Sequence, residues 1–132
     1  MHSCTISAGF RTLEVRFDRA GEAGTGGPKT MWMRTKVAII DGEEPTPFQK
    51  ISPLGDCGNG ISHNSSLDQV MYINPDLHLS LHRDPVGDWF CSKAVSHWHQ
   101  NGIGMSDAEL FDARGPVGRA VQGLLLAPTT GR

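Results

Sequence analysis

The chain has 132 residues, and its 12 basic and 14 acidic side chains give a net charge of −2. A chain of this length buries roughly two thirds of its unfolded surface, so we expect a single domain, 1–132, with frayed ends at 1–8 and 128–132. The charges form no basic stripe, which argues against nucleic acid as a partner. The longest apolar runs, "VAII" and "GLLLA", are far too short to span a bilayer, so we expect a soluble chain without a membrane segment.

The cysteines indicate the compartment. Cys4, Cys57 and Cys91 are odd in number and form no C-x-x-C pair. A chain of this size does not need disulfides to support its core. We therefore expect free thiols and a reducing, cytoplasmic location.

The first forty residues predict a pair of strands. "FRTLEVRF" (10–17) alternates apolar and charged residues, and "TMWMRTKVAII" (30–40) is rich in residues that favour strands. The glycine-rich segment 21–29 between them predicts a long loop.

A short helix is predicted next. Thr46 followed by Pro47 is typical of a helix start, and Phe48, Ile51 and Leu54 then recur at helical spacing. Proline and several glycines follow closely, and each disfavours a helix interior by about 1 to 3 kcal/mol. We therefore expect this helix to be short or irregular.

The rest of the chain predicts strands. Four segments are separated by the turn sequences "DPVG", "NG" and "RGP", and they cover residues 71–83, 88–100, 102–113 and 117–128. Turns this short suit hairpins, so we expect an antiparallel meander. One helix and about six strands indicate an α+β domain.

The histidines do not predict a metal site. On a strand, His78 and His82 share a face but stand roughly 13 Å apart, too far to bind one ion. We expect an ordinary strand here, with its buried side formed by Leu77, Leu79 and Leu81. His97 and His99 have the spacing of two ligands, yet no third ligand is placed near them, and polar residues on a solvated or subunit-facing surface explain the pattern equally well.

Three polar residues lie where apolar ones are expected or where a turn begins. Asp56 follows the apolar stripe of the helix, among small residues that permit close approach of a backbone or a ligand. Asn74 precedes Pro75, and Gln122 shares a strand face with Ala120, Leu124 and Leu126. Buried amides and carboxylates need partners, although a turn, a strand entry and a cross-strand hydrogen bond would each explain one of them. The common nucleophile and nucleotide-binding motifs are absent from the sequence.

The order of elements resembles the acyl-CoA thioesterase II family of hot-dog thioesterases, and specifically its C-terminal hot-dog repeat. The similarity is carried by "LGDCGNG", "INPDLHLSLHRDPVGDW" and "DARGPVGRAVQGLLL", and it runs from about residue 9 to 127. It implies a hot-dog fold, with one helix packed on an antiparallel sheet of about six strands. In that family an Asp on the helix, a hydroxyl residue at the next strand and a Gln on the last strand hold the hydrolytic water, and these positions fall on Asp56, Asn74 and Gln122.

The chemistry that this resemblance implies is hydrolysis of acyl-CoA to a free acid and CoA, as part of lipid metabolism. Asp56 would act as general base, and backbone amides near a helix terminus would stabilise the oxyanion. Neither a cofactor nor a metal is implied. The acyl chain would lie between helix and sheet, and the CoA phosphates would meet basic residues such as Arg11, Lys36, Lys50 or Arg83.

Two departures from the family pattern leave alternatives open. Asn74 stands where the family has Thr or Ser, so a hot-dog domain that no longer catalyses, acting as a subunit or acyl-binding module, is the main alternative. Relatives carry two repeats in tandem and this chain has room for one, so we expect a homodimer that rebuilds the double hot dog, or part of a longer protein. A hot-dog hydratase would need a His paired with a carboxylate, and His63 has no such partner in the sequence.

Overall fold

The computed structural model describes residues 13–18, 26–66 and 68–129. These ranges hold nine elements, in the order β1 (Leu13–Phe17), β2 (Lys29–Thr35), α1 (Pro47–Gly55), α2 (Gly58–Ser62), β3 (Val70–Ile73), β4 (His78–Leu81), β5 (Phe90–Trp98), β6 (Ile103–Asp112) and β7 (Gly115–Pro128). The predicted strand residues 10–12, the loop residues 21–25 and the terminal residues 1–8 and 130–132 lie outside the described ranges. Pro128 closes β7, and the Thr129 N–H donates to the Gln69 carbonyl at 2.8 Å.

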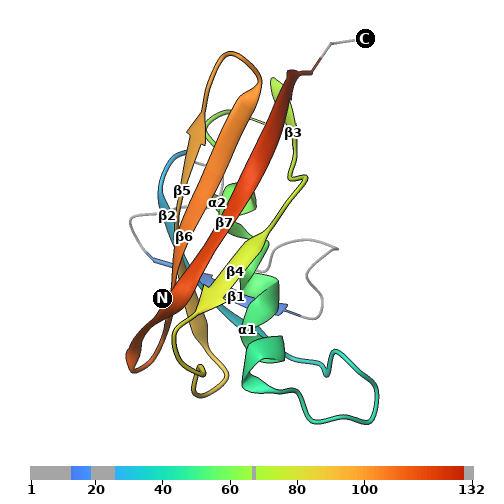
Figure 1. Ribbon diagram of the computed structural model, residues 1–132, viewed down its shortest axis with the longest axis vertical. Helices are drawn as coiled ribbons and strands as arrows, with labels where there is room; N and C mark the ends of the chain where they lie inside the picture. Colours follow the sequence, from blue (N-terminus) through green and yellow to red (C-terminus); the bar gives the residue numbers. More distant parts are fainter. Residues whose placement is uncertain (1–12, 19–25, 67, 130–132) are drawn as a thin grey trace.

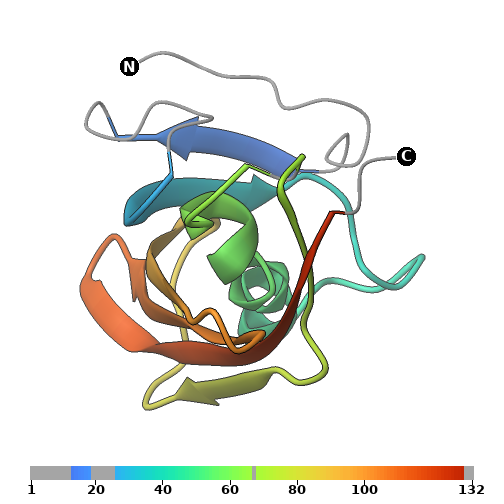
Figure 2. The ribbon, with the colours of Figure 1, turned by 90° about the horizontal axis from the view of Figure 1, so that it is seen from above.

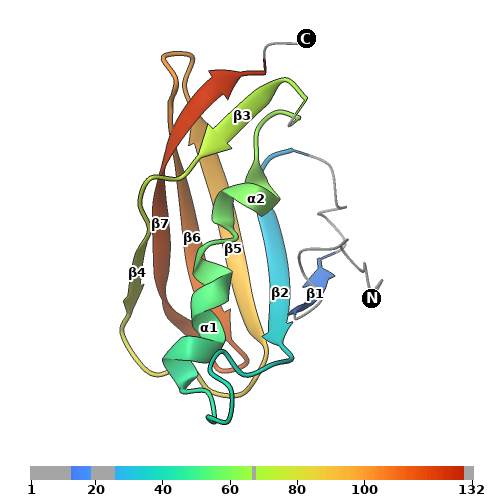
Figure 3. The ribbon, with the colours of Figure 1, turned by 90° about the vertical axis from the view of Figure 1, so that its right-hand side faces the viewer.

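The strands form one antiparallel sheet in the order β1-β2-β5-β6-β7-β3, with β4 paired to an earlier part of β7 (Figure 1). Seen from above, the sheet curls around the two helices (Figure 2). From the side, α1 and α2 follow one another along its inner face (Figure 3). This is the α+β hot-dog arrangement that the sequence predicts.

The start of α1 agrees with its sequence. The Gln49 N–H donates to Thr46 Oγ1 at 3.2 Å, the Thr46 N–H donates to Gln49 Oε1 at 2.8 Å, and Pro47 occupies the first turn. This reciprocal cap satisfies two N–H groups that the helix itself leaves without partners. The expected single helix is divided into two, because residues 56 and 57 form a turn between α1 and α2.

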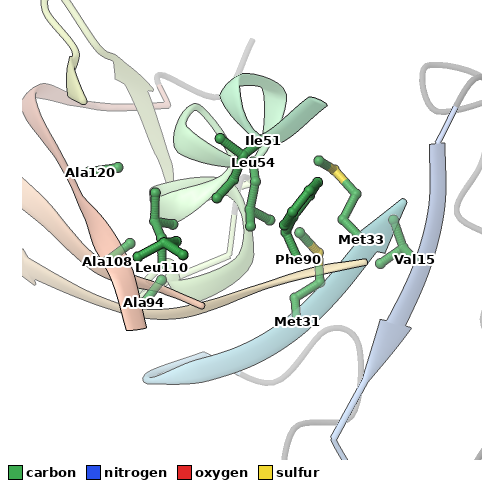
Figure 4. Packing of buried hydrophobic residues seen from close by; sticks show 11 residues of the cluster. Val15, Met31, Met33, Ile51, Leu54, Phe90, Ala94, Ala108, Leu110 and Ala120 are labelled. Atoms are coloured by element: carbon green, nitrogen blue, oxygen red, sulfur yellow. The ribbon is translucent and has the colours of Figure 1, made fainter. Parts of the chain in front are cut away.

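The hydrophobic core lies between α1 and the concave face of the sheet (Figure 4). Ile51 and Leu54 on the helix and Phe90 and Leu110 on the sheet are completely inaccessible to solvent. The two methionines of β2, Met31 and Met33, extend this core toward β1. The apolar stripe read from the sequence of α1 therefore packs as predicted, except for Phe48, which is exposed.

The predicted four-strand meander is wrong in one connection. β5, β6 and β7 do form consecutive hairpins, but β4 pairs with β7, and β5 lies between β2 and β6. The "DPVG" turn therefore belongs to a crossing connection, from the β7 side of the sheet to its centre. Turn residues alone do not distinguish a hairpin from such a crossing, because both need a tight change of direction.

An ion pair holds this connection in place. Arg83 donates two hydrogen bonds of 2.7 Å to the two carboxylate oxygens of Asp112, whose side chain has no solvent-accessible surface. The same carboxylate accepts from the Val86 N–H at 2.9 Å and from the Arg114 N–H at 2.8 Å. Hydrogen bonds from Arg83 above all, and from these amides, hold the pKa of Asp112 well below its usual range. One carboxylate thus ties the crossing connection to the β6–β7 turn.

Two strand predictions extend too far. β2 ends at Thr35, and Val37, Ile39 and Ile40 are exposed in a loop that leads to α1. The predicted strand at 71–83 is interrupted between β3 and β4, so Leu77 is 43% exposed instead of buried, while Leu79 and Leu81 do pack on the core. A composition that favours strands does not show at which residue the neighbouring strand, and with it the backbone hydrogen bonding, ends.

In the part of the chain that the structure describes, neither helix is long or apolar enough to cross a membrane.

The Asp112 carboxylate is expected to be a main contributor to stability. Asp112→Asn should lower the free energy of unfolding by about 2 to 3 kcal/mol in urea denaturation at pH 7, because it leaves Arg83 without its charged partner. The lowered pKa makes the stabilisation present above the unfolded value of about 4 and lost below it, so the difference from wild type should shrink on acidification. The matched control is Asp107→Asn, which breaks the more exposed pair with Arg119 and should cost far less. Equal losses in the two variants would contradict this assignment.

Candidate active site

Asp56, Asn74 and Gln122 meet at the junction of the two helices with the edge of the sheet. Asp56 is the C-cap of α1, Asn74 follows β3, and Gln122 lies on β7. Gln122 Nε2 and Asn74 Nδ2 each donate to Asp56 Oδ1, both at 2.9 Å. Residues that are 18 and 66 positions apart in the sequence therefore share one carboxylate oxygen.

Gln122 is buried and its amide is satisfied. The side chain is 2% exposed and points inward with Ala120 and Leu124. Its Nε2 also donates to the backbone carbonyl of Asp56 at 3.1 Å, and its Oε1 accepts from the Asn59 N–H at 3.4 Å. A buried amide without partners would cost about 1 to 3 kcal/mol, so the hydrogen bonds of this residue tie β7 to the helix junction.

Asn74 reaches Asp56 because the edge of the sheet is interrupted there. β3 ends at Ile73 and β4 begins at His78, so β7 lacks a strand partner between them. The Asp76 carboxylate takes the place of that partner and accepts from the Gly123 N–H at 2.7 Å. A Cβ at Gly123 would lie 2.7 Å from an Asp76 oxygen, so this contact needs glycine.

The second carboxylate oxygen of Asp56, Oδ2, differs from the first in its contacts. Within the described residues no group donates to Oδ2, and both Asp56 and Asn74 are exposed at the surface. A carboxylate with one oxygen held by two amides and the other facing solvent can take a proton from a water molecule. The arrangement therefore suits general-base chemistry on a substrate that approaches from the sheet edge.

A polar row lies beneath α2. Ser96, Ser106 and Gln122 are neighbours across β5, β6 and β7, and all three are buried. Ser96 Oγ is 2.7 Å from Ser62 Oγ on α2. A Cβ at Gly58 would lie 2.5 Å from Ser106 Oγ, so glycine lets α2 approach the sheet this closely. Such a row is unusual between helix and sheet, where the family resemblance implies an apolar tunnel.

Two further residues join this network without a clear signal in the sequence. Trp98 Nε1 donates to Asn59 Oδ1 at 2.9 Å, and the Trp98 ring lies 6.2 Å from that of Tyr72. Asn59 is 1% exposed, and its Nδ2 has no hydrogen-bond partner within the described residues. The only sequence sign is a polar residue between two glycines in "GNG".

The cysteine beside Asp56 is not an activated nucleophile. Burial, and then the charge of Asp56, raises the pKa of the Cys57 thiol to about 11. Its Sγ lies 3.3 Å from the Pro53 carbonyl oxygen, to which it can donate. Burial and the Asp56 charge also raise the pKa of Tyr72, whose hydroxyl therefore stays protonated at neutral pH.

None of the histidines in the described residues forms a hydrogen bond with Asp56, Asn74 or Gln122. His78, His82, His97 and His99 are exposed, and His63 Nδ1 is 3.2 Å from the Gly60 carbonyl oxygen. Among the residues that the structure describes, no three His, Cys, Asp or Glu side chains are grouped so that they could hold a metal ion.

The basic residues considered for CoA phosphates have other partners where they are described. Lys50 pairs with Asp88 at 2.9 Å, Arg83 with Asp112, and Lys36 lies 3.8 Å from Glu14. Arg11 lies outside the described residues.

Comparison with known proteins places the chain in a family. Residues 3–126 match the family described as "Acyl-CoA thioesterase C-terminal domain". Since this match covers almost the whole chain, the protein belongs to that family, which confirms the resemblance seen in the sequence. No curated protein matches the sequence significantly.

Similar solved structures share the fold. An acyl-CoA thioesterase II, TesB2, from Mycobacterium marinum matches with a TM-score of 0.63 at 16% identity. The matched region covers 100% of this chain and 58% of the TesB2 chain. A TesB protein from Mycobacterium avium subs paratuberculosis matches with a TM-score of 0.61 at 16% identity, over 89% of this chain and 48% of the TesB chain. A putative thioesterase from Silicibacter sp. matches with a TM-score of 0.63 at 15% identity, over 89% of this chain and 81% of the thioesterase chain. The chain thus spans about half the length of the TesB proteins.

The raised pKa of Cys57 predicts slow reaction with thiol reagents. In a Cys4→Ser background at pH 8, both Cys57 and Cys91, whose pKa burial also raises to about 11, should react about a hundredfold more slowly in the native protein than in urea, because few thiolates form. The native rate should continue to rise above pH 9, where an unperturbed thiol levels off. The reaction is followed by the absorbance of the coloured group that the thiol reagent releases. Equal rates of reaction in the native and the urea-denatured protein would contradict the burial of these thiols.

Proposed function

We propose that the chain hydrolyses acyl-CoA thioesters to a free acid and CoA, with Asp56 as the general base. The observation that carries this proposal is the exposed carboxylate of Asp56, which has one oxygen held by Gln122 and Asn74 and the other without a hydrogen-bond partner among the described residues. Membership of the acyl-CoA thioesterase family supports the choice of substrate class.

The reaction proceeds without a covalent enzyme intermediate. Asp56 Oδ2 takes a proton from a water molecule while the water oxygen attacks the thioester carbonyl carbon. The tetrahedral intermediate collapses as the C–S bond breaks, and the CoA sulfur leaves with the proton that Asp56 carries. The buried thiol of Cys57 takes no part, because a pKa of about 11 leaves it protonated.

Gln122 and Asn74 act by holding the base. Each side-chain amide donates one N–H to Asp56 Oδ1 and so orients the carboxylate, and Gln122 Nε2 also donates to the Asp56 carbonyl. Asn74 keeps its own Oδ1 as an acceptor for the attacking water, a function that a Thr or Ser hydroxyl serves in the family pattern. Replacement of the hydroxyl by an amide is thus compatible with a held water.

The alternative is a hot-dog domain that binds acyl groups or serves as a subunit without catalysis. Asn74 favours this alternative, since an amide and a hydroxyl orient a water differently. The two functions differ in one outcome, which is acid release from acyl-CoA by the purified protein.

We also propose that two copies associate at the β3–β4 edge, so that a homodimer covers the site. Ile73, Leu125 and Ile103 are neighbours across β3, β7 and β6, and all three are more than half exposed. Asp56 and Asn74 are exposed at the same edge. An edge strand with unpaired backbone groups beside apolar side chains suits isologous pairing, which would also remove water from around the substrate.

Loss of the base should abolish most of the activity. Asp56→Asn keeps an oxygen for the two amide donors but cannot take the proton, so we expect kcat to fall by about a hundredfold or more. The assay measures released CoA with a thiol-reactive dye over short, medium and long acyl-CoAs. Asp68→Asn, at an exposed turn position, is the matched control and should keep wild-type rates. Equal inertness of wild type and Asp56→Asn over the whole panel would favour the binding module.

The dimer should depend on the apolar edge. Ile73→Lys should shift the protein to monomer in light scattering at micromolar concentration, because it places a charge in the proposed contact. Ile39→Lys changes an exposed isoleucine in a distant loop and should leave the dimer intact. A monomeric wild type would refute the proposed association.

A further inference from the structure

A chain of hydrogen bonds leads from the end of β5 to the proposed base. Trp98 Nε1 donates to Asn59 Oδ1 at 2.9 Å, the Asn59 N–H donates to Gln122 Oε1 at 3.4 Å, and Gln122 Nε2 donates to Asp56 Oδ1 at 2.9 Å. The reaction described above uses neither Trp98 nor Asn59.

The direction of these bonds fixes which way the Gln122 amide faces. An amide presents an acceptor on one side and donors on the other. The Asn59 N–H can only donate, so it requires Oε1 on its side and leaves Nε2 for Asp56. A flipped amide would set Oε1 against the carboxylate and carbonyl oxygens of Asp56 and Nε2 against the Asn59 N–H, which loses all three bonds.

Asn59 is held in turn by Trp98. Its Oδ1 accepts the indole N–H, and the side chain is 1% exposed, so no water competes for this bond. The indole is itself confined, because it contacts the Tyr72 ring and a Cβ at Gly104 would lie 3.2 Å from Trp98 Cδ1. Tyr72 lies on β3, the strand that leads to Asn74. Trp98 therefore contacts Asn59, whose backbone N–H reaches the Gln122 amide, and β3, the strand that leads to Asn74.

We propose that Trp98 is a positioning residue for Asp56, acting through Asn59 and Gln122. The kinetic consequence rests on the proposed hydrolase function, whereas the effect on the Gln122 amide does not depend on it. The two consequences therefore give separate readouts.

The kinetic test removes the indole N–H and keeps an aromatic ring. Trp98→Phe should lower kcat about tenfold and leave KM within about twofold, because a displaced base weakens the transition state more than substrate binding. The matched control is Trp32→Phe, on the face of β2 opposite the buried Met31 and Met33, which should keep wild-type kinetics. A fall in kcat no larger than that of the control would overturn the kinetic consequence.

The second test needs no activity. In ¹⁵N-labelled protein, the side-chain amide protons of Gln122 should exchange with solvent at least about tenfold faster in Trp98→Phe than in wild type or Trp32→Phe. Unchanged exchange would overturn the positioning inference, whatever the kinetics show. Faster exchange with an inactive wild type would support the positioning contact and reject the proposed hydrolase function.

A variant of Asn59, the hydrogen-bond partner of Trp98, shows whether Trp98 and Asn59 act as one unit. Asn59→Ala removes the acceptor for Trp98 and keeps the backbone N–H that reaches Gln122. If Trp98 and Asn59 act in series, the double variant Trp98→Phe/Asn59→Ala should lose no more protection of the Gln122 amide protons than the single variant with the larger loss. Additive losses in amide protection would show that Trp98 acts by another path and would overturn the inference.

Discussion

The buried amide of Gln122 is the constraint on which the rest of this structure depends. It is 2% exposed on the inward face of β7, where Ala120 and Leu124 flank it along the strand, and its hydrogen-bonding groups must be satisfied by the protein. Its partners are the carbonyl and carboxylate of Asp56 and the N–H of Asn59, all at the helix junction. β7 and the helices are therefore fixed relative to one another by polar contacts here, and apolar packing around Ile51, Leu54 and Phe90 holds α1 to the sheet farther along.

The proposed site forms where two regular elements stop. The helix is divided at Asp56, and the edge strand is interrupted at Asn74, so each residue leaves its own element at the point where the two face each other. Asp76 and Gly123 stabilise the interruption by replacing a missing strand partner. Irregular backbone thus places a carboxylate and an amide within 2.9 Å while the apolar core beneath stays closely packed. The chemical consequence is a carboxylate at the surface whose second oxygen has no hydrogen-bond partner among the described residues.

Much of the fold follows from local patterns in the sequence. The capping residues Thr46 and Gln49 define the start of α1, and alternating residues define β5, β6 and β7. The position of β4 could not be predicted, because β4 pairs with β7 and not with the next strand along the chain, and turn residues do not reveal that choice. The sequence identifies Asp56, Asn74 and Gln122 as polar residues at positions where apolar or turn residues are expected. The family resemblance then predicts that the three form one site. Asn59 and Trp98 gave no such signal, since their contacts exist only after α2 packs on the sheet.

The most direct test of the account follows the oxygen atom of the water. Acyl-CoA is hydrolysed in H₂¹⁸O with enzyme in excess over substrate, and both the acid and the peptide that contains Asp56 are analysed by mass spectrometry. If Asp56 acts as a base on a held water, the released acid carries one ¹⁸O atom after a single turnover and the Asp56 peptide carries none. Label in the Asp56 carboxylate would show that it attacks the thioester itself and would contradict the account.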